Sequence, residues 1–162
     1  MSRGFSFIKV LTERTRVRYN SDDMRKVGLD IGSKTCGVAV SDIFNLTAQG
    51  VANLIYPEKD WLNLVNQIEQ VTSEYQFDTF VIGYPRFPSG DKPTNARRID
   101  QILPLLKKRF KKVKFVLMDE HRTTKKAAQI MQQAGLSQQK QKMLKDQIAA
   151  QIILDDYLTS SL

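Results

Sequence analysis

The stretch Val27-Gly-Leu-Asp-Ile-Gly-Ser-Lys-Thr-Cys-Gly-Val-Ala-Val-Ser41 places two apolar runs of strand length around a short polar turn. The runs at 27–31 and 36–41 are therefore expected to pair as a hairpin. Asp30 is the one acid within this stretch. A carboxylate in a buried strand is unfavourable unless it is paired or holds a cation, so Asp30 is the first candidate functional residue. Gly28 and Gly32 flank it on the same face and are expected to leave space for a ligand.

Further strands and helices follow the hairpin in a regular order. A weaker third strand is expected over 50–56, and short buried strands over 79–83 and 113–118. Apolar residues at helical spacing predict helices over 60–75, 94–111, 123–134 and 144–158. Three meandering strands, followed by strands separated by helices, describe an α/β fold with a mixed five-stranded sheet and helices on both faces. That is the layout of the ribonuclease H-like fold.

Length and composition predict one domain with an extension. Residues 1–23 show no sustained periodicity and end in a turn-like run, so we expect a flexible N-terminal extension followed by a single domain over 24–162. No segment is apolar enough for a membrane span, which takes about 20 residues. The apolar patch near the N-terminus is too short for a signal peptide. We therefore expect a cytoplasmic protein without membrane contact.

The residue types present limit the chemistry. One cysteine, Cys36, and one histidine, His121, exclude a disulfide framework and a Cys/His zinc site. Any catalysis is expected to depend on carboxylates, and the metals that suit carboxylates are Mg²⁺ and Mn²⁺. The net charge of +8 favours a polyanionic partner, although a soluble basic protein without such a partner has the same charge.

Two further positions offer acids. Asp119 and Glu120 end the strand expected over 113–118, and functional residues often lie just beyond strand ends. Since successive strand residues point to opposite faces, one of the two should face the site. Glu120 is favoured over Asp119 because its longer side chain reaches further. Asp146 lies on the last helix, on one face with Ala149, Ala150, Ile153 and Tyr157.

Taken together, the acids predict a metal site. The two small alanines would let the last helix approach the sheet until Asp146 reaches Asp30. Carboxylates from a first strand, a later strand end and a terminal helix are the ligands that two-metal phosphodiester hydrolysis needs. The predicted catalytic and metal-binding residues are Asp30, Glu120 and Asp146, with Asp119 as the less favoured alternative. The simpler interpretation of Asp119 and Glu120 is a solvated charge pair, and that of Asp146 is an acid favoured by the dipole in a first helical turn.

Basic residues accompany these acids in the sequence. The segment 107–126 holds nine Lys or Arg and two acids, which are the candidates Asp119 and Glu120. A basic surface beside a carboxylate site is typical of a nuclease. The predicted nucleic-acid-binding residues are Lys34, Arg97, Arg98, Lys111, Lys112, Lys114, Arg122, Lys125 and Lys126.

Four segments resemble motifs of the YqgF family, whose members are described as pre-16S rRNA nucleases and earlier as Holliday junction resolvases. Residues 27–42 resemble its opening motif, and Phe80-Val-Ile-Gly-Tyr-Pro85 its second. Asp119-Glu-His-Arg-Thr-Thr124 is similar to its Asp-Glu-Arg-Leu-Thr/Ser-Thr motif, with His121 at the arginine's place and Arg122 next. Lys145-Asp-Gln-Ile-Ala-Ala-Gln-Ile-Ile-Leu154 resembles its terminal helix. The resemblance covers about residues 24–158.

The resemblance implies a metal-dependent endonuclease that processes the 5′ end of pre-16S rRNA in ribosome biogenesis, as a monomer or homodimer. A Holliday junction resolvase acting on branched DNA in recombination and repair is the alternative, because both substrates offer the same phosphodiester. The turn after Asp30 is also similar to the first phosphate loop of actin-like ATPases and sugar kinases, but 162 residues are too few for their two lobes. A third class is a non-catalytic protein that binds nucleic acid or ribosomes, which would not need converging acids.

Overall fold

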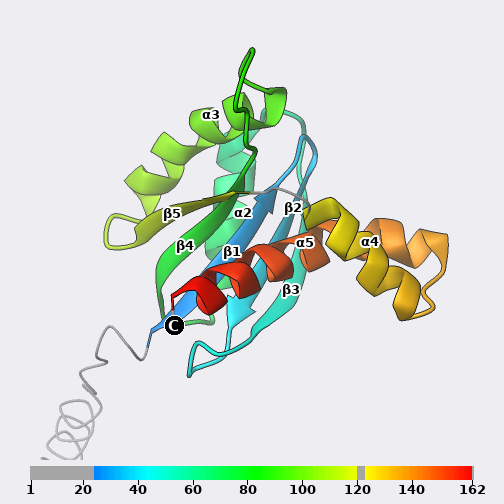
Figure 1. Ribbon diagram of the computed structural model, residues 1–162. Coiled ribbons are helices and arrows are strands. Elements are labelled where there is room, and N and C mark those ends of the chain that lie inside the picture. Colours follow the sequence, from blue (N-terminus) through cyan, green and yellow to red (C-terminus); the bar gives the residue numbers. More distant parts are fainter. Residues whose placement is uncertain (1–23, 120–122, 162) are drawn as a thin grey trace, which may run out of the picture.

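The computed structural model describes residues 24–119 and 123–161, which form a five-stranded sheet with helices on both faces (Figure 1). The predicted extension over 1–23, and Glu120, His121 and Arg122, lie outside the described residues. The strands are β1 (Arg25–Ile31), β2 (Thr35–Ser41), β3 (Ala48–Ile55), β4 (Phe77–Tyr84) and β5 (Lys114–Asp119). The helices are α2 (Trp61–Thr72), α3 (Thr94–Arg109), α4 (Thr123–Gln133) and α5 (Gln138–Ser160).

The sheet is mixed, with the strand order β3-β2-β1-β4-β5. β1 and β2 form the predicted antiparallel hairpin, in which Asp30 is the register partner of Gly37. β4 runs parallel to β1, and β5 runs parallel to β4. The carboxyl ends of these three strands therefore meet at one edge of the sheet, which we call the carboxyl edge. The expected α/β class and mixed five-stranded sheet are confirmed.

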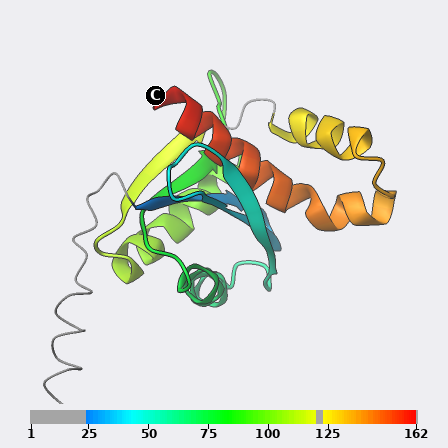
Figure 2. The same cartoon turned by 90° about the horizontal axis from the view of Figure 1, so that it is seen from below.

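Two layers of helices enclose the sheet. α2 and α3 cover one face, and α5 crosses the other, with α4 beside it (Figure 2). Side chains alternate between the two faces along each strand, so apolar residues pack against both layers of helices. In β1, Val27, Leu29 and Ile31 join the larger core cluster with α2 and α3. Ala39, Val81, Ala150 and Leu154 belong to the smaller cluster beneath α5. No helix within the described ranges is long and apolar enough to cross a membrane.

Glycines let α5 lie directly against the sheet. A Cβ added to Gly37 would come within 1.8 Å of the backbone oxygen of Asp146, and one added to Gly28 within 2.8 Å of that of Ala150. Real Cβ atoms essentially never come this close, so only glycine permits this packing. The expectation that Gly28 leaves space for a ligand is wrong, because α5 occupies that space. At Gly32 a Cβ would lie 3.1 Å from the backbone oxygen of Thr35 in the turn itself.

The last helix is longer than its apolar spacing predicts. It begins at Gln138 rather than at residue 144, and Ser137 caps it by accepting a hydrogen bond from the backbone nitrogen of Lys140. The added turns are polar and mostly exposed, so they carry no apolar periodicity that sequence analysis can detect. Asp146 therefore lies more than two turns inside α5, which removes the simpler interpretation of an acid favoured by the first helical turn.

Candidate active site

Asp30 lies near the carboxyl end of β1 on the face that α5 covers. Its neighbours Leu29 and Ile31 point into the larger core cluster on the other face, and Gly28 contacts α5. Asp30 therefore shares the face of Gly28 by strand alternation. Its register partner Gly37 has no side chain, which leaves the space beside the Asp30 backbone to the main chain of α5.

Asp146 reaches the same place from the helix. Its backbone oxygen lies over Gly37, and its carboxylate accepts a hydrogen bond from the hydroxyl of Thr35 at the start of β2. Because Gly37 pairs with Asp30, the structure brings Asp30 and Asp146 to one location on one face. Both acids also influence Cys36. Burial raises the pKa of the Cys36 thiol well above its usual range, and the negative charges of Asp30 and Asp146 raise this pKa further.

Asp119 does not lie with Asp30 and Asp146. Its carboxylate forms an ion pair with Arg86, with 2.8 Å between Arg86 Nε and Asp119 Oδ2. The preceding residue, Met118, packs against the smaller cluster beneath α5. Successive residues of a strand alternate faces, so Asp119 lies on the face away from α5. Glu120, the favoured third acid, lies outside the described residues.

Asp30 and Asp146 are candidate ligands for a metal ion. Within residues 24–119 and 123–161, no group of three or more Asp, Glu, His or Cys side chains is placed to hold a metal ion. Asp30 and Asp146 still supply carboxylate oxygens from two rigid elements, which are the donors that Mg²⁺ and Mn²⁺ prefer. The donor chemistry fits such an ion, and a third ligand has to come from outside the described residues or from the substrate.

The predicted basic residues divide between the two edges of the sheet. Lys34 in the turn after β1, and Arg97 and Arg98 near the start of α3, lie at the carboxyl edge with Asp30. Lys111, Lys112 and Lys114 lie at the opposite edge, because β5 begins there and its six residues span about 17 Å or more. Lys125 and Lys126 are exposed on α4, and Lys126 forms a 3.6 Å ion pair with Asp156. Arg122 lies outside the described residues.

Sequence reasoning missed three residues that shape the site. Thr35 holds Asp146, and its position two residues before Gly37 places it on the same face. Tyr56 donates its hydroxyl hydrogen bond to the backbone oxygen of Gly32, in the turn after Asp30. Burial raises the pKa of Tyr56 to about 12, so its hydroxyl stays protonated. Asn53 pairs with Gly37 in the sheet and donates to the backbone oxygen of Met143, which fastens the first half of α5.

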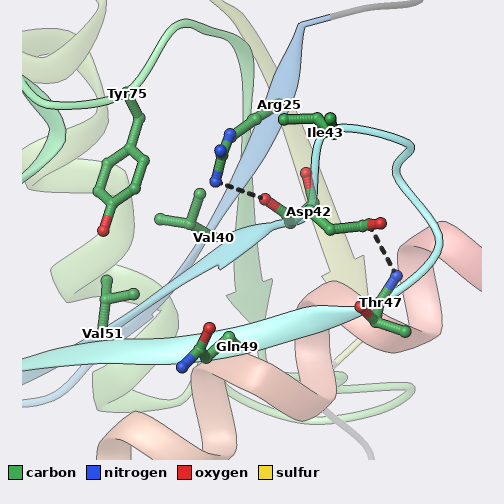
Figure 3. A pocket seen from close by; sticks show the side chains of 9 residues that line it. Arg25, Val40, Asp42, Ile43, Thr47, Gln49, Val51 and Tyr75 are labelled. Carbon is green, nitrogen blue, oxygen red and sulfur yellow. Dashed lines mark hydrogen bonds between the residues drawn. The ribbon is translucent and has the colours of Figure 1, made fainter.

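A pocket of about 320 Å³ lies away from these acids, at the edge of the sheet where β1 begins (Figure 3). It holds one acid, Asp42, which accepts backbone hydrogen bonds from Leu46 and Thr47. The Thr47 bond is the largest cause of the lowered pKa of Asp42. Arg25 donates to the backbone oxygen of Ser41 across 3.4 Å in the same pocket. These hydrogen bonds stabilise the loop after β2. Because the pocket lies where β1 begins, and Asp30 lies near the other end of that strand, Asp42 does not belong to the candidate site.

Two solved structures share the fold. A fowlpox virus resolvase, solved with substrate Holliday junction DNA, aligns with a TM-score of 0.56 and 18% identity over 86% of this chain and 99% of that one. Thermus thermophilus RuvC, in complex with a Holliday junction substrate, aligns with a TM-score of 0.53 and 13% identity over 85% of this chain and 95% of that one. These likenesses place the fold in the ribonuclease H-like class.

Within that class the chain belongs to the RuvX family, whose model is described as "Holliday junction resolvase" and matches residues 24–160. A Mycoplasmopsis pulmonis protein named "Putative pre-16S rRNA nuclease" is 35% identical over 86% of this chain and 95% of its own length. Proteins of the same name from Ureaplasma parvum and Mesoplasma florum are 36% and 39% identical, over 85% and 82% of this chain and 98% and 94% of their own lengths. The resemblance seen in the sequence is confirmed, and membership indicates a hydrolytic endonuclease that acts on nucleic acid.

Proposed function

We propose that the protein is a metal-dependent endonuclease that trims the 5′ end of pre-16S rRNA. The observation that carries the proposal is the meeting of Asp30 and Asp146 at Gly37, on one face of the sheet at its carboxyl edge. The names of the relatives support the RNA substrate. A solvated surface acid would not need a helix backbone pressed onto a glycine to bring it beside a second acid.

Asp30 and Asp146 would hold the divalent metal, with Glu120 as the third ligand. The Arg86 ion pair and the side of the strand that Met118 takes both favour Glu120 over Asp119. Divalent cations held by such carboxylates activate the attacking water and stabilise the leaving oxygen of a phosphodiester. The metals we propose are Mg²⁺ or Mn²⁺, since the donors are oxygens.

The chain's other residues orient these acids. The Thr35 hydroxyl donates to Asp146 and leaves the second carboxylate oxygen available to a ligand. Tyr56 holds the turn after Asp30 through the oxygen of Gly32, which keeps the end of β1 in place. Lys34 lies in that turn, is exposed, and supplies a positive charge for a phosphate next to the acids.

A Holliday junction resolvase is the second candidate, because the matching family model is described by that activity. Branched DNA offers the same phosphodiester to the same acids. Resolution of a four-way junction requires two sites acting together, and therefore a dimer.

The test is parallel incubation of the purified chain, with Mg²⁺ or Mn²⁺, with precursor 16S rRNA and with a four-way DNA junction. We expect cleavage of the RNA that falls by orders of magnitude in Asp30→Asn and in Asp146→Asn. The double variant should lose little more than either single one, because removal of one ligand already disables the site.

Asp156→Asn is the matched control. Asp156 is an exposed acid on the same helix as Asp146, paired only weakly with Lys126, so its loss should leave cleavage unchanged. Cleavage by Asp30→Asn and Asp146→Asn at the rate of Asp156→Asn would refute the metal-nuclease mechanism. Cleavage of the junction alone would favour the resolvase.

A further inference from the structure

A pocket of about 170 Å³ lies between the N-terminal ends of α2 and α3. Lys59 and Trp61 line it from the α2 side, and Thr94, Arg97 and Arg98 from the α3 side. Both helices begin at the carboxyl edge, since each follows a strand that ends there. The pocket is therefore at the same edge of the sheet as Asp30, in the layer of α2 and α3.

A chain of contacts joins this pocket to the turn after Asp30. The Trp61 ring lies against Tyr56, with 6.1 Å between the ring centroids. The Tyr56 hydroxyl donates to the backbone oxygen of Gly32, two residues beyond Asp30. Tyr56 is almost fully buried in the core, so it fixes the position of Trp61 relative to this turn. These contacts fix the position of the pocket relative to the turn after Asp30.

The pocket lining holds three cations and one acid, so its net charge is positive, and one of the cations, Arg98, donates a hydrogen bond to Asn95 Oδ1. Among the described residues, the ion pairs involve none of its three cations, Lys59, Arg97 and Arg98, and Glu58 is the single acid in its lining. The first turn of α3 has no acid, and Pro93 before it provides no side-chain cap. The free backbone N–H groups of that turn add to the positive potential.

We propose that this pocket binds one unpaired nucleotide of the substrate strand, at the same edge of the sheet as the candidate active site. The base would stack on Trp61 and its phosphate would be bound by Arg97 and Arg98. Aromatic rings take up bases that are free of a duplex, and arginine binds phosphate through two donors. A base stacked within a duplex cannot enter, so the pocket selects a single strand over a duplex. This inference rests on the proposed nuclease function and specifies its substrate.

Trp61 is the one tryptophan of the chain, so its fluorescence reports directly on the pocket. The full chain is titrated, with EDTA present and at low salt, with a mixed single-stranded RNA of about ten nucleotides, within the size range of single-strand sites. A blunt RNA duplex of the same sequence is titrated in parallel. Labelled RNA gives total binding independently, by fluorescence anisotropy. We expect the single strand to quench Trp61 at saturation and the duplex to leave its fluorescence unchanged.

The matched variants remove two charges each from opposite ends of α3. Arg97→Ala with Arg98→Ala removes the pocket cations, whereas Lys107→Ala with Lys108→Ala removes two from the last turn. We expect the arginine variant to weaken single-strand binding by about tenfold, corresponding to about 1.4 kcal/mol, and the lysine variant by less than about twofold. Trp61→Ala removes the stacking ring and should weaken single-strand binding, followed by anisotropy, by about fivefold or more, whereas Trp61→Phe keeps a ring and should bind more tightly than Trp61→Ala.

Single-strand binding without a change in Trp61 fluorescence, equal losses in the two double variants, or no single-strand binding would each overturn the inference. Unfolding midpoints confirm that the variants remain folded. Because the titration contains no metal, its result does not depend on cleavage. If Asp30→Asn and Asp146→Asn both cleave at the control rate, the proposed metal-nuclease mechanism fails while the titration still reports on the pocket. If the chain cleaves RNA without quenching, the pocket assignment alone fails.

Discussion

The hydroxyl of Thr35 donates a hydrogen bond to the carboxylate of Asp146, across 111 residues of sequence. This bond links the start of β2 to the middle of α5, directly beside the pairing of Asp30 with Gly37. It gives the Asp146 carboxylate a fixed orientation, which the proposed metal ligand requires. Thr35 is therefore a positioning residue for the proposed site.

Thr35→Val should lower cleavage by about 10- to 100-fold, as the loss of an outer hydrogen bond to a metal ligand typically does. Valine keeps the shape of the side chain but removes the donor. We expect the variant to need more Mg²⁺ for half-maximal cleavage, measured by metal titration of the rate. Thr35→Ser restores the hydroxyl and should restore the metal requirement. An unchanged metal requirement in Thr35→Val would show that the hydrogen bond has only a structural role.

Gly37→Ala should destabilise the fold by about 1–3 kcal/mol or more, because overpacking at a backbone contact cannot be relieved by a side-chain rotation. The new Cβ would meet the backbone oxygen of Asp146 at 1.8 Å. Gly50→Ala is the comparison variant, because its Cβ would lie 2.5 Å from Cγ of Gln147 and 3.1 Å from the Gln147 backbone oxygen, so we expect a smaller loss there than at Gly37. Urea unfolding measures both variants. A loss in Gly50→Ala as large as in Gly37→Ala would contradict the contact that places Asp146.

Substitution of Lys111, Lys112 and Lys114 by alanine should reduce the salt dependence of RNA binding. Removal of one phosphate-binding cation changes the slope of log K against log salt by about 0.7 to 0.9. These lysines lie at the opposite edge from Asp30, so cleavage at saturating RNA should keep its rate. Affinity at several salt concentrations, together with the single-turnover rate, separates the two effects. An unchanged slope would mean that the lysines only face solvent.

Asp155→Asn should stabilise the protein at neutral pH, by less than about 1 kcal/mol because the side chain is partly exposed. Burial raises the pKa of Asp155 above its ordinary value of 3.8, so its folded form holds the proton more tightly than its unfolded form. The stability that this provides is complete below pH 3.8 and is lost as pH rises through the raised pKa.

The amide oxygen introduced by Asp155→Asn can still accept the hydrogen bond from the backbone nitrogen of Ala48, so the substitution removes the charge and keeps the contact. Urea unfolding at pH 7 and below pH 3.8 should show a difference between variant and wild type only at pH 7. A variant that is less stable at pH 7 would contradict the sign.

The fold was predictable because its signals are local. The hairpin around Gly32 and the helices with an apolar face are visible as periodic patterns, and both acids stand out within apolar surroundings. The first turns of α5 were not predictable, since they are polar and mostly exposed. The role of Gly28 was not predictable from the sequence. A glycine can make room either for a ligand or for a helix backbone, and only the position of α5 shows that Gly28 makes room for the helix.

The sequence does not show how the charged residues are divided between the two edges of the sheet. Lys114 and Asp119 are close in sequence, yet they lie at opposite ends of β5 because an extended strand separates them. The pairing of Thr35 with Asp146 was also hidden, because a hydroxyl that contacts a helix far along the chain leaves no local pattern. Sequence reasoning expected Asp146 to approach Asp30 through the small residues of the last helix, but it missed the polar contact from Thr35 that holds Asp146 there.

The contact of α5 with Gly37 also sets an order of events during synthesis. Chains are made from the N-terminus, so Asp30 emerges long before Asp146, and the two acids meet only after the last helix packs onto the finished sheet. A partly synthesised chain up to α4 therefore holds half of the acid pair and cannot assemble the proposed cutting centre.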